Sequence, residues 1–271
     1  MRWTTMLVSF LFATLNGQSL PDFFELDSLL DNGGLRRATV LLEQAPEDHP
    51  GILYRRGRAQ ALLGDFPSAV RLLQKAQDAA TSARDSVTLV RTHAELARLY
   101  RSQEVDSASF YRHVRLATDL AFATQQKELQ ALGWYWSGMA LLDRLLRAEP
   151  TDLRRWGYAD SALDYFSAAA RAYRSHGDLP AAALARSRRG AVYERIGLPD
   201  SAIIYAQECL RTVEQMDAVG AAQQARIRLA TGYLVRQDSA SLCTALPLWR
   251  EALSYARAHE LEYDERLDCT E

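Results

Sequence analysis

Two stretches of the chain, RRGRAQALLGDFPSA at residues 55–69 and RRGAVYERIGLPDSA at residues 188–202, share one pattern of small and helix-breaking residues. In each, a second glycine follows the first after seven residues, and a proline and an alanine come next. Gly57 and Gly190 lie inside helical periods, where glycine costs about 1 kcal/mol relative to alanine, so we expect two helices to approach closely there. Gly64 and Gly197 suit a left-handed residue that ends a helix. The pattern therefore predicts two copies of a helix, a tight turn and a second helix.

The tripeptide Asp-Ser-Ala predicts further starts of second helices, because an aspartate before a helix accepts hydrogen bonds from its first backbone N–H groups. It occurs at 106–108, 160–162, 200–202 and 238–240. We expect six helical hairpins in all. Their first helices are predicted at about 22–31, 51–63, 83–102, 124–147, 181–196 and 217–236. Their second helices are predicted at about 35–45, 67–80, 107–122, 159–175, 200–215 and 240–259, the last restarting near Ala245 because of Pro247.

These features resemble the tetratricopeptide repeat family, whose helix–turn–helix unit has about 34 residues. In the second unit the signature positions fall on Leu53, Gly57, Gly64, Phe66, Ala69, Leu73 and Ala76, and in the fifth on Gly190, Tyr193, Gly197, Ala202 and Cys209. The resemblance implies an all-α fold, an α-α superhelix that forms a right-handed solenoid of about six hairpins. It also implies a concave face, lined by first helices, that binds peptides or partner helices.

Composition narrows the class of protein. Hydrophobic residues make up 48% of the 271 residues and charged residues 24%, which is typical of a globular chain and not of a disordered one. A formal net charge of -2 argues against a nucleic-acid partner, because such proteins usually carry a basic excess. We find no strand pattern and, after the N-terminal segment, no apolar run long enough to span a membrane.

Residues 1–19 are typical of a secretory signal peptide: Arg2 precedes a short apolar run, and small residues follow at Gly17 and Ser19. A buried first helix is the alternative. The predicted organisation is then a signal peptide at 1–19, a repeat domain at 20–260 and a polar tail at 261–271. The mature protein is expected to be exported, to the periplasm or the extracellular space.

No motif indicates an enzyme, a metal site or another cofactor. The five histidines (His49, His93, His113, His176 and His259) show no metal-ligand spacing, and we expect solvated or capping roles for those in turns or near helix ends. Of the three cysteines, Cys209, Cys243 and Cys269, two can form a disulfide, or Cys209 is simply a small buried residue.

Carrying the family's groove positions over by unit gives a set of candidate partner-binding residues: Tyr54, Arg58, Arg91, Arg98, Arg101, Tyr135, Met139, Glu194 and Arg195. Arginines beside tyrosines can hold an acidic segment or a terminal carboxylate, since guanidinium binds carboxylate through two parallel hydrogen bonds. The alternative is that these arginines are only solvated, because arginine supplies most of the chain's positive charge. The lysine/asparagine carboxylate clamp of some family members is not matched.

The starts of the second helices in the third and fourth units are about 20 residues farther apart than the family spacing allows. This extra length predicts an inserted loop near 146–158. Trp156 in this loop either anchors a partner or covers the neighbouring helix. In the run Trp134-Tyr135-Trp136, consecutive aromatics point to different sides of one helix, so at least one of them is expected to face the groove.

Together these features predict a non-enzymatic scaffold of the cell envelope that binds a protein or peptide on its concave face. Two alternatives stay open. One is the sensory or regulatory repeat domain of a signalling system acting through a partner, and the other is a helical-repeat component of a surface uptake complex.

Overall fold

The computed structural model describes residues 20–103, 106–216 and 218–258, and every regular element in them is an α-helix. The first helices of the six hairpins are α2 (Phe23–Asp31), α4 (Pro50–Leu62), α6 (Ser86–Gln103), α8 (Lys127–Arg147), α10 (Leu179–Arg195) and α12 (Val219–Arg236). The second helices are α3 (Leu35–Glu43), α5 (Phe66–Ala83), α7 (Ser107–Ala123), α9 (Arg154–His176), α11 (Pro199–Glu214) and α13 (Ser239–Ala258). The predicted all-α class and the pairing into hairpins are confirmed.

Aspartate caps set several of these helix starts. Asp65, Asp106 and Asp238 each accept a hydrogen bond from the backbone N–H three residues on, at 3.0, 2.9 and 2.8 Å. Three of the four Asp-Ser-Ala copies therefore lie at a helix start as predicted, although Asp200 is in the first turn of α11 and does not cap it. The fourth does not, because Asp160 lies inside α9.

The glycines of the repeated pattern have the two roles that the sequence predicts. A Cβ at Gly57 would lie 2.7 Å from Leu73 Cγ, and one at Gly190 would lie 3.1 Å from the carbonyl oxygen of Ala202. Only glycine lets these helix pairs come so close. Gly64 and Gly197 have φ values of 80° and 84° and end α4 and α10 in the left-handed conformation.

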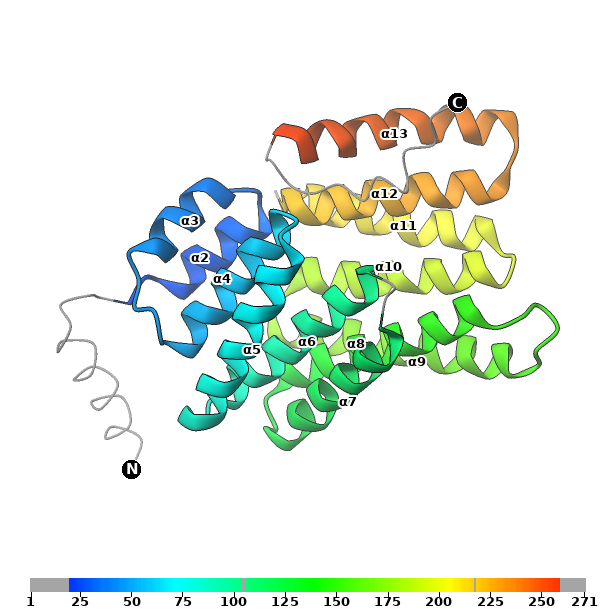
Figure 1. Cartoon of the computed structure of the whole chain (residues 1–271). Coiled ribbons are helices and arrows are strands. Elements are labelled where there is room, and N and C mark those ends of the chain that lie inside the picture. Colours follow the sequence, from blue (N-terminus) through cyan, green and yellow to red (C-terminus); the bar gives the residue numbers. More distant parts are fainter. Residues whose placement is uncertain (1–19, 104–105, 217, 259–271) are drawn as a thin grey trace.

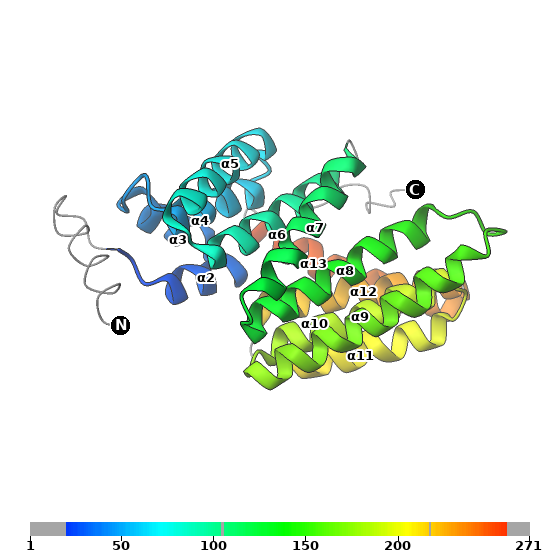
Figure 2. The same ribbon diagram turned by 90° about the horizontal axis from the view of Figure 1, so that it is seen from below.

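The hairpins stack in chain order, and the row curves (Figures 1 and 2). Each first helix from α4 to α12 also packs against the first helix of the preceding hairpin. Among the described residues no comparable contact joins the second helices of neighbouring hairpins. First helices therefore form the inner layer, and second helices stand apart from one another on the outer side.

The curvature brings the last hairpin back to the first. The start of α12 meets the end of α2 so closely that a Cβ at Gly220 would clash with the backbone oxygen of Asp31. We call this contact the seam. Because of it, the space inside the row is bordered by both ends of the repeat domain.

Two local predictions are wrong. The extra residues near 146–158 form no long loop: α8 has 21 residues and α9 has 23, with a link only at 148–153, so most of the insertion lengthens the hairpin. The last helix does not restart near Ala245, because α13 continues through Pro247. Pro247 is exposed, so the backbone oxygen of Cys243 that it leaves without an N–H donor can be hydrated.

Within the described residues, no helix is both long and apolar enough to cross a membrane. Cys209 is buried, as expected, and both it and Cys243 are free thiols. The predicted signal peptide at 1–19, the tail at 261–271, His259 and Cys269 lie outside the described residues.

Candidate binding cavity

The inner layer borders an open cavity of about 600 Å³, and seven of the predicted groove residues line it. They come from first helices: Tyr54, Arg58, Arg91, Arg98, Arg101, Tyr135 and Met139. A second cavity of about 340 Å³ lies at the seam, between the first and last hairpins. The two cavities share Asp31, Arg58, Glu95, Arg98 and Gln224, so they form one continuous inner surface.

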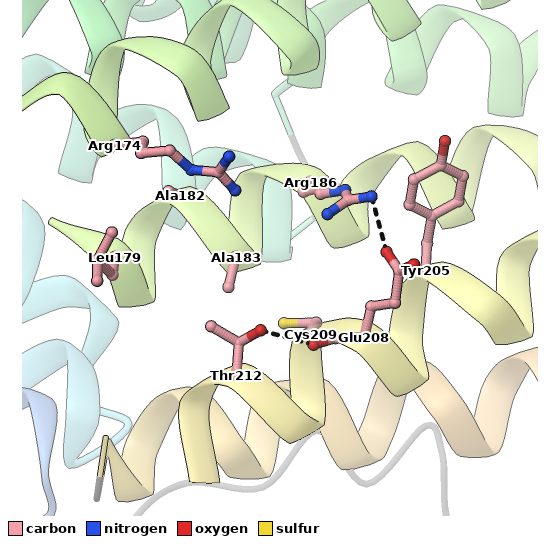
Figure 3. Close-up of a pocket in the computed structure, with 9 residues that line it drawn as sticks. All are labelled: Arg174, Leu179, Ala182, Ala183, Arg186, Tyr205, Glu208, Cys209 and Thr212. Atoms are coloured by element: carbon pink, nitrogen blue, oxygen red, sulfur yellow. Dashed lines mark hydrogen bonds and ion pairs between the residues drawn. The ribbon is translucent and has the colours of Figure 1, made fainter. Parts of the chain in front are cut away.

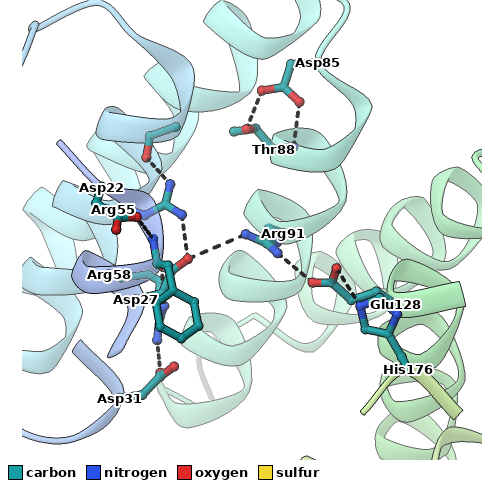
Figure 4. Close-up of polar contacts among 12 residues, drawn as sticks. Asp22, Asp27, Asp31, Arg55, Arg58, Asp85, Thr88, Arg91, Glu128 and His176 are labelled. Carbon is teal, nitrogen blue, oxygen red and sulfur yellow. Dashed lines mark hydrogen bonds and ion pairs between the residues drawn. The ribbon is translucent and has the colours of Figure 1, made fainter. Parts of the chain in front are cut away.

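Arginines and carboxylates alternate on the side of the cavity formed by α2, α4 and the start of α6, which we call the N-terminal wall (Figure 4). Asp27 lies 2.5 Å from Arg55, 3.4 Å from Arg58 and 3.7 Å from Arg91. Asp31 takes the other side of Arg58 at 2.6 Å. Because Arg55 is only 4% exposed and stacks on Phe23, Asp27 is the carboxylate that neutralises a buried cation.

The same alternation continues into the middle of the cavity. Arg91 reaches Glu128 on α8 at 2.6 Å, and Glu128 also lies 3.5 Å from His176 at the end of α9. Arg98 pairs with Glu95 at 2.6 Å, and this carboxylate raises the pKa of the Arg98 guanidinium. The lining of the larger cavity holds five arginines and five carboxylates, so the arginines that the sequence singles out are balanced in charge.

The opposite side, formed by α10 and α12, is the C-terminal wall, and its charge is not balanced. Arg188 donates from Nε to the hydroxyl of Tyr135 at 2.9 Å, and Arg228 lies 3.5 Å from Glu194. Burial, together with repulsion from Arg188 and Arg101, lowers the pKa of Arg228 to about 10. Burial also raises the pKa of the Glu194 carboxyl. The guanidiniums of Arg188 and Arg228 therefore share a partly dehydrated region with the carboxylate of Glu194, which favours the binding of an anion.

Aromatic and aliphatic side chains of α8 lie between the two walls. Leu129, Leu132, Tyr135, Trp136 and Met139 line the cavity. Trp134 points to the other side of α8, where its ring packs against Phe122 and Tyr165. The expectation that at least one member of the aromatic run faces the groove is confirmed for Tyr135 and Trp136.

Two predicted site residues lie elsewhere. Arg195 donates a hydrogen bond to the backbone oxygen of Leu146, at the far end of α8, because it is turned about 100° from Glu194 around α10. Trp156 lies in the first turn of α9, 51% exposed, with the Arg155 guanidinium 5.8 Å from its ring centroid. Neither side chain lines the inner cavities.

Sequence reasoning predicted Glu194 but missed the carboxylates on the N-terminal wall and in the middle of the cavity, because acidic residues on helices usually face solvent. Their spacing offered a signal: Asp27 and Asp31 are four residues apart, and Glu95 follows Arg91 by four residues and precedes Arg98 by three. Such spacings place side chains on one face of a helix. Arg188 and Arg228 were missed as well, although both lie on helices that the sequence assigned to the inner layer.

A smaller pocket of about 220 Å³ lies between α9, α10 and α11 and contains a thiol (Figure 3). Cys209 lies at its base, and Arg186 pairs with Glu208 at 2.9 Å near its edge. Burial raises the pKa of the Cys209 thiol to about 11. The thiol is therefore protonated at neutral pH and is a poor nucleophile.

A buried histidine pair joins α6 to α7. The Nδ1 atoms of His93 and His113 lie 3.0 Å apart, and the ring of His113 stacks on Tyr100. Burial lowers the pKa of both imidazoles, that of His113 to about 4. No group of three or more metal-ligating side chains forms around this pair or elsewhere in the described residues.

Comparison with known proteins gives no further guide to the site. No protein-family model matches the chain, and no curated protein matches its sequence.

Proposed function

We propose that the protein is a binding scaffold that holds a segment of another protein in the inner cavity. The proposal is supported chiefly by the C-terminal wall, where Arg188 and Arg228 repel each other beside the carboxylate of Glu194. An anionic group of the ligand would relieve their mutual repulsion and accept hydrogen bonds from guanidinium. Next to it, the α8 side chains offer an apolar surface for a neighbouring side chain of the same segment.

The size of the cavity is consistent with a short segment and not with a folded domain. About 600 Å³ is within the range of small-molecule and peptide sites. The N-terminal wall would contribute shape more than charge, because its ion pairs are already formed within the chain. We therefore expect the ligand to carry one carboxylate beside an apolar residue, as at the end of a polypeptide or in an acidic turn.

Site-specific photocrosslinking tests this proposal. A photoreactive residue at Gln224, which is exposed and lines both inner cavities, should crosslink to a partner in the cells of origin. The matched control is Ile204, which is exposed on α11. Adding Arg188→Glu should abolish the crosslink at Gln224. Equal crosslinking from Gln224 and Ile204, or a crosslink at Gln224 that survives Arg188→Glu, would contradict cavity binding.

The tetratricopeptide-like assignment and the export of the chain are part of the same proposal. The hairpin stacking and the glycine contacts at Gly57 and Gly190 support the former. The apolar run in 1–19 supports export, to the periplasm or the extracellular space. N-terminal sequencing of the protein recovered from the envelope fraction tests export, and a cytoplasmic product that retains Met1 would contradict it.

A further inference from the structure

A groove of about 560 Å³ lies on the outer side of the molecule, between the second helices α7 and α9. Residues of α7, among them Tyr111, Arg112 and Arg115, form one wall, and Tyr165 of α9 stands on the other side. Ser137, Ala140 and Leu141 of α8 form the floor. We call this feature the α7–α9 groove. It shares no lining residue with the inner cavities.

The α7–α9 groove carries an excess of positive charge. Arg112, Arg115 and Arg144 line it, all three are exposed, and none lies within 4.0 Å of a carboxylate oxygen in the part of the chain that the structure describes. Asp119 is the one acidic residue in its lining. This contrasts with the larger inner cavity, where arginines and carboxylates are equal in number.

An aromatic ring is fixed between these arginines. The hydroxyl of Tyr111 donates to Asp143 Oδ2 at 2.8 Å, and burial and this hydrogen bond raise the pKa of Tyr111 to about 12. The guanidinium of Arg144 lies 5.2 Å from the centroid of the ring. Since the hydroxyl is already bonded inside the protein, Tyr111 offers a ligand the remaining surface of its ring rather than a hydrogen bond.

The next groove along the row provides an internal comparison, because it is built in the same way from α9, α10 and α11 (Figure 3). There the lining holds two arginines, Arg174 and Arg186, and Glu208 neutralises Arg186 at 2.9 Å. The space measures about 220 Å³. The shared architecture alone therefore does not produce an open basic groove. The excess of three arginines over one carboxylate is specific to the α7–α9 groove.

We propose that the α7–α9 groove docks an acidic segment of a partner protein, with carboxylates on Arg112, Arg115 and Arg144 and an apolar side chain over Ala140 and Leu141. The planar guanidinium group matches the geometry of a carboxylate. The apolar floor would contribute to binding only if the ligand also carries an apolar side chain. A nucleic acid is disfavoured, because the chain carries a net charge of -2 and the basic patch is too short to follow a phosphate backbone.

The test uses fluorescence anisotropy with the full-length chain and a labelled probe. The probe is a short glutamate peptide with a central pair of leucines, amidated at its C-terminus so that it lacks a terminal carboxylate. The variant Arg112→Glu/Arg115→Glu should weaken binding by about tenfold for each reversed charge. The matched control Arg174→Glu/Arg186→Glu, in the neighbouring groove, should change the dissociation constant by less than about twofold, because the charges it alters lie outside the α7–α9 groove.

Several results would overturn the proposal: no measurable binding to the wild-type chain, equal losses in the two double variants, or tighter binding of single-stranded DNA than of the peptide. Replacing the leucines with glutamines should also reduce affinity, and unchanged affinity would contradict the role of the apolar floor. Arg188→Gln in the inner cavity should leave peptide binding intact. The outcome is therefore separate from that of the crosslinking experiment on the cavity.

Discussion

Arginines meet carboxylates on the N-terminal wall of the inner cavity, whereas on the C-terminal wall they meet other arginines. A single carboxylate, that of Asp27, lies within 4.0 Å of three arginines, Arg55, Arg58 and Arg91. On the opposite side Arg188 and Arg101 repel Arg228, whose nearest carboxylate is that of Glu194 at 3.5 Å. The arginines of the N-terminal wall are neutralised by carboxylates of the same chain, whereas those of the C-terminal wall outnumber the carboxylates near them. The difference teaches that the number of arginines in a groove says little about ligands until their partners are known.

Removing Asp27 should produce the largest effect on this comparison. Asp27→Asn leaves the buried guanidinium of Arg55 without its carboxylate, so we expect a loss of about 3 kcal/mol in the free energy of unfolding. The matched variant Asp31→Asn removes a carboxylate that is 61% exposed, and should cost less than about 1 kcal/mol. Urea unfolding of both variants checks this, and equal losses would show that the N-terminal wall is not organised around Asp27.

The histidine pair between α6 and α7 is buried with no ion pair to a carboxylate of the described residues, unlike the arginines of the N-terminal wall. Instead, His93 and His113 are kept in the neutral form. The pKa of His113 falls from 6.5 to about 4 on folding, so the unfolded chain binds the proton more readily. The free energy of unfolding is therefore at its full value above about pH 6.5 and decreases as the pH falls, by about 2 kcal/mol at pH 5.

Urea unfolding between pH 7.5 and 5 measures this slope, and His113→Phe provides the control. Phenylalanine can keep the stacking on Tyr100 but cannot be protonated. The variant should be less dependent on pH over this range than the wild type. An identical slope in the two proteins would show that other groups are responsible.

The hairpin layout could be predicted from the sequence because its determinants are local. Gly64 and Gly197 end helices, and Asp65, Asp106 and Asp238 start them, and each acts within a few residues. Asp160 misled the prediction, because apolar packing of Ala159 and Ala162 extends α9 through a motif that elsewhere starts a helix. Helix propensity in a lengthened hairpin outweighed the capping preference.

The charge balance of the cavity could not be predicted in the same way. Asp27 meets Arg91 across α2 and α6, and Glu128 meets it from α8, so the pairing depends on how three hairpins curve. Arg188 faces the cavity by the same long-range geometry. A repeat pattern indicates which helix lines the groove, but the partner of each side chain comes from tertiary contacts that a single unit does not encode.

The two walls meet at the seam. A substitution at Gly220 tests whether the contact between the first and last hairpins is needed for the shape of the inner cavity. In Gly220→Ala the new Cβ would clash with the backbone oxygen of Asp31, so the first and last hairpins have to separate. The loss of stability should be only about 1 kcal/mol, because the strain is relieved by giving up a small contact area. The radius of gyration from small-angle scattering should increase.

Gly157→Ala is the control for this change, since a Cβ there meets no atom within 4 Å and alanine is the better helix former. It should leave the radius of gyration unchanged and raise stability slightly. If both variants scatter like the wild type, the seam adjusts without opening and the inner cavity keeps its shape.

The smallest effect, and the most direct comparison of the walls, comes from neutralising one arginine on each. Arg188→Gln removes repulsion from Arg228 and should raise stability by about 0.5 kcal/mol, whereas Arg58→Gln removes a partner of Asp27 and Asp31 and should lower it. Added sulfate should stabilise the wild-type chain more than Arg188→Gln, because an anion can occupy the crowded C-terminal wall only while its charge remains. Parallel thermal unfolding with and without the salt measures both differences. If the two substitutions lower stability equally and respond alike to sulfate, the C-terminal wall is as well paired as the N-terminal wall, and the reason to expect an anionic ligand there is lost.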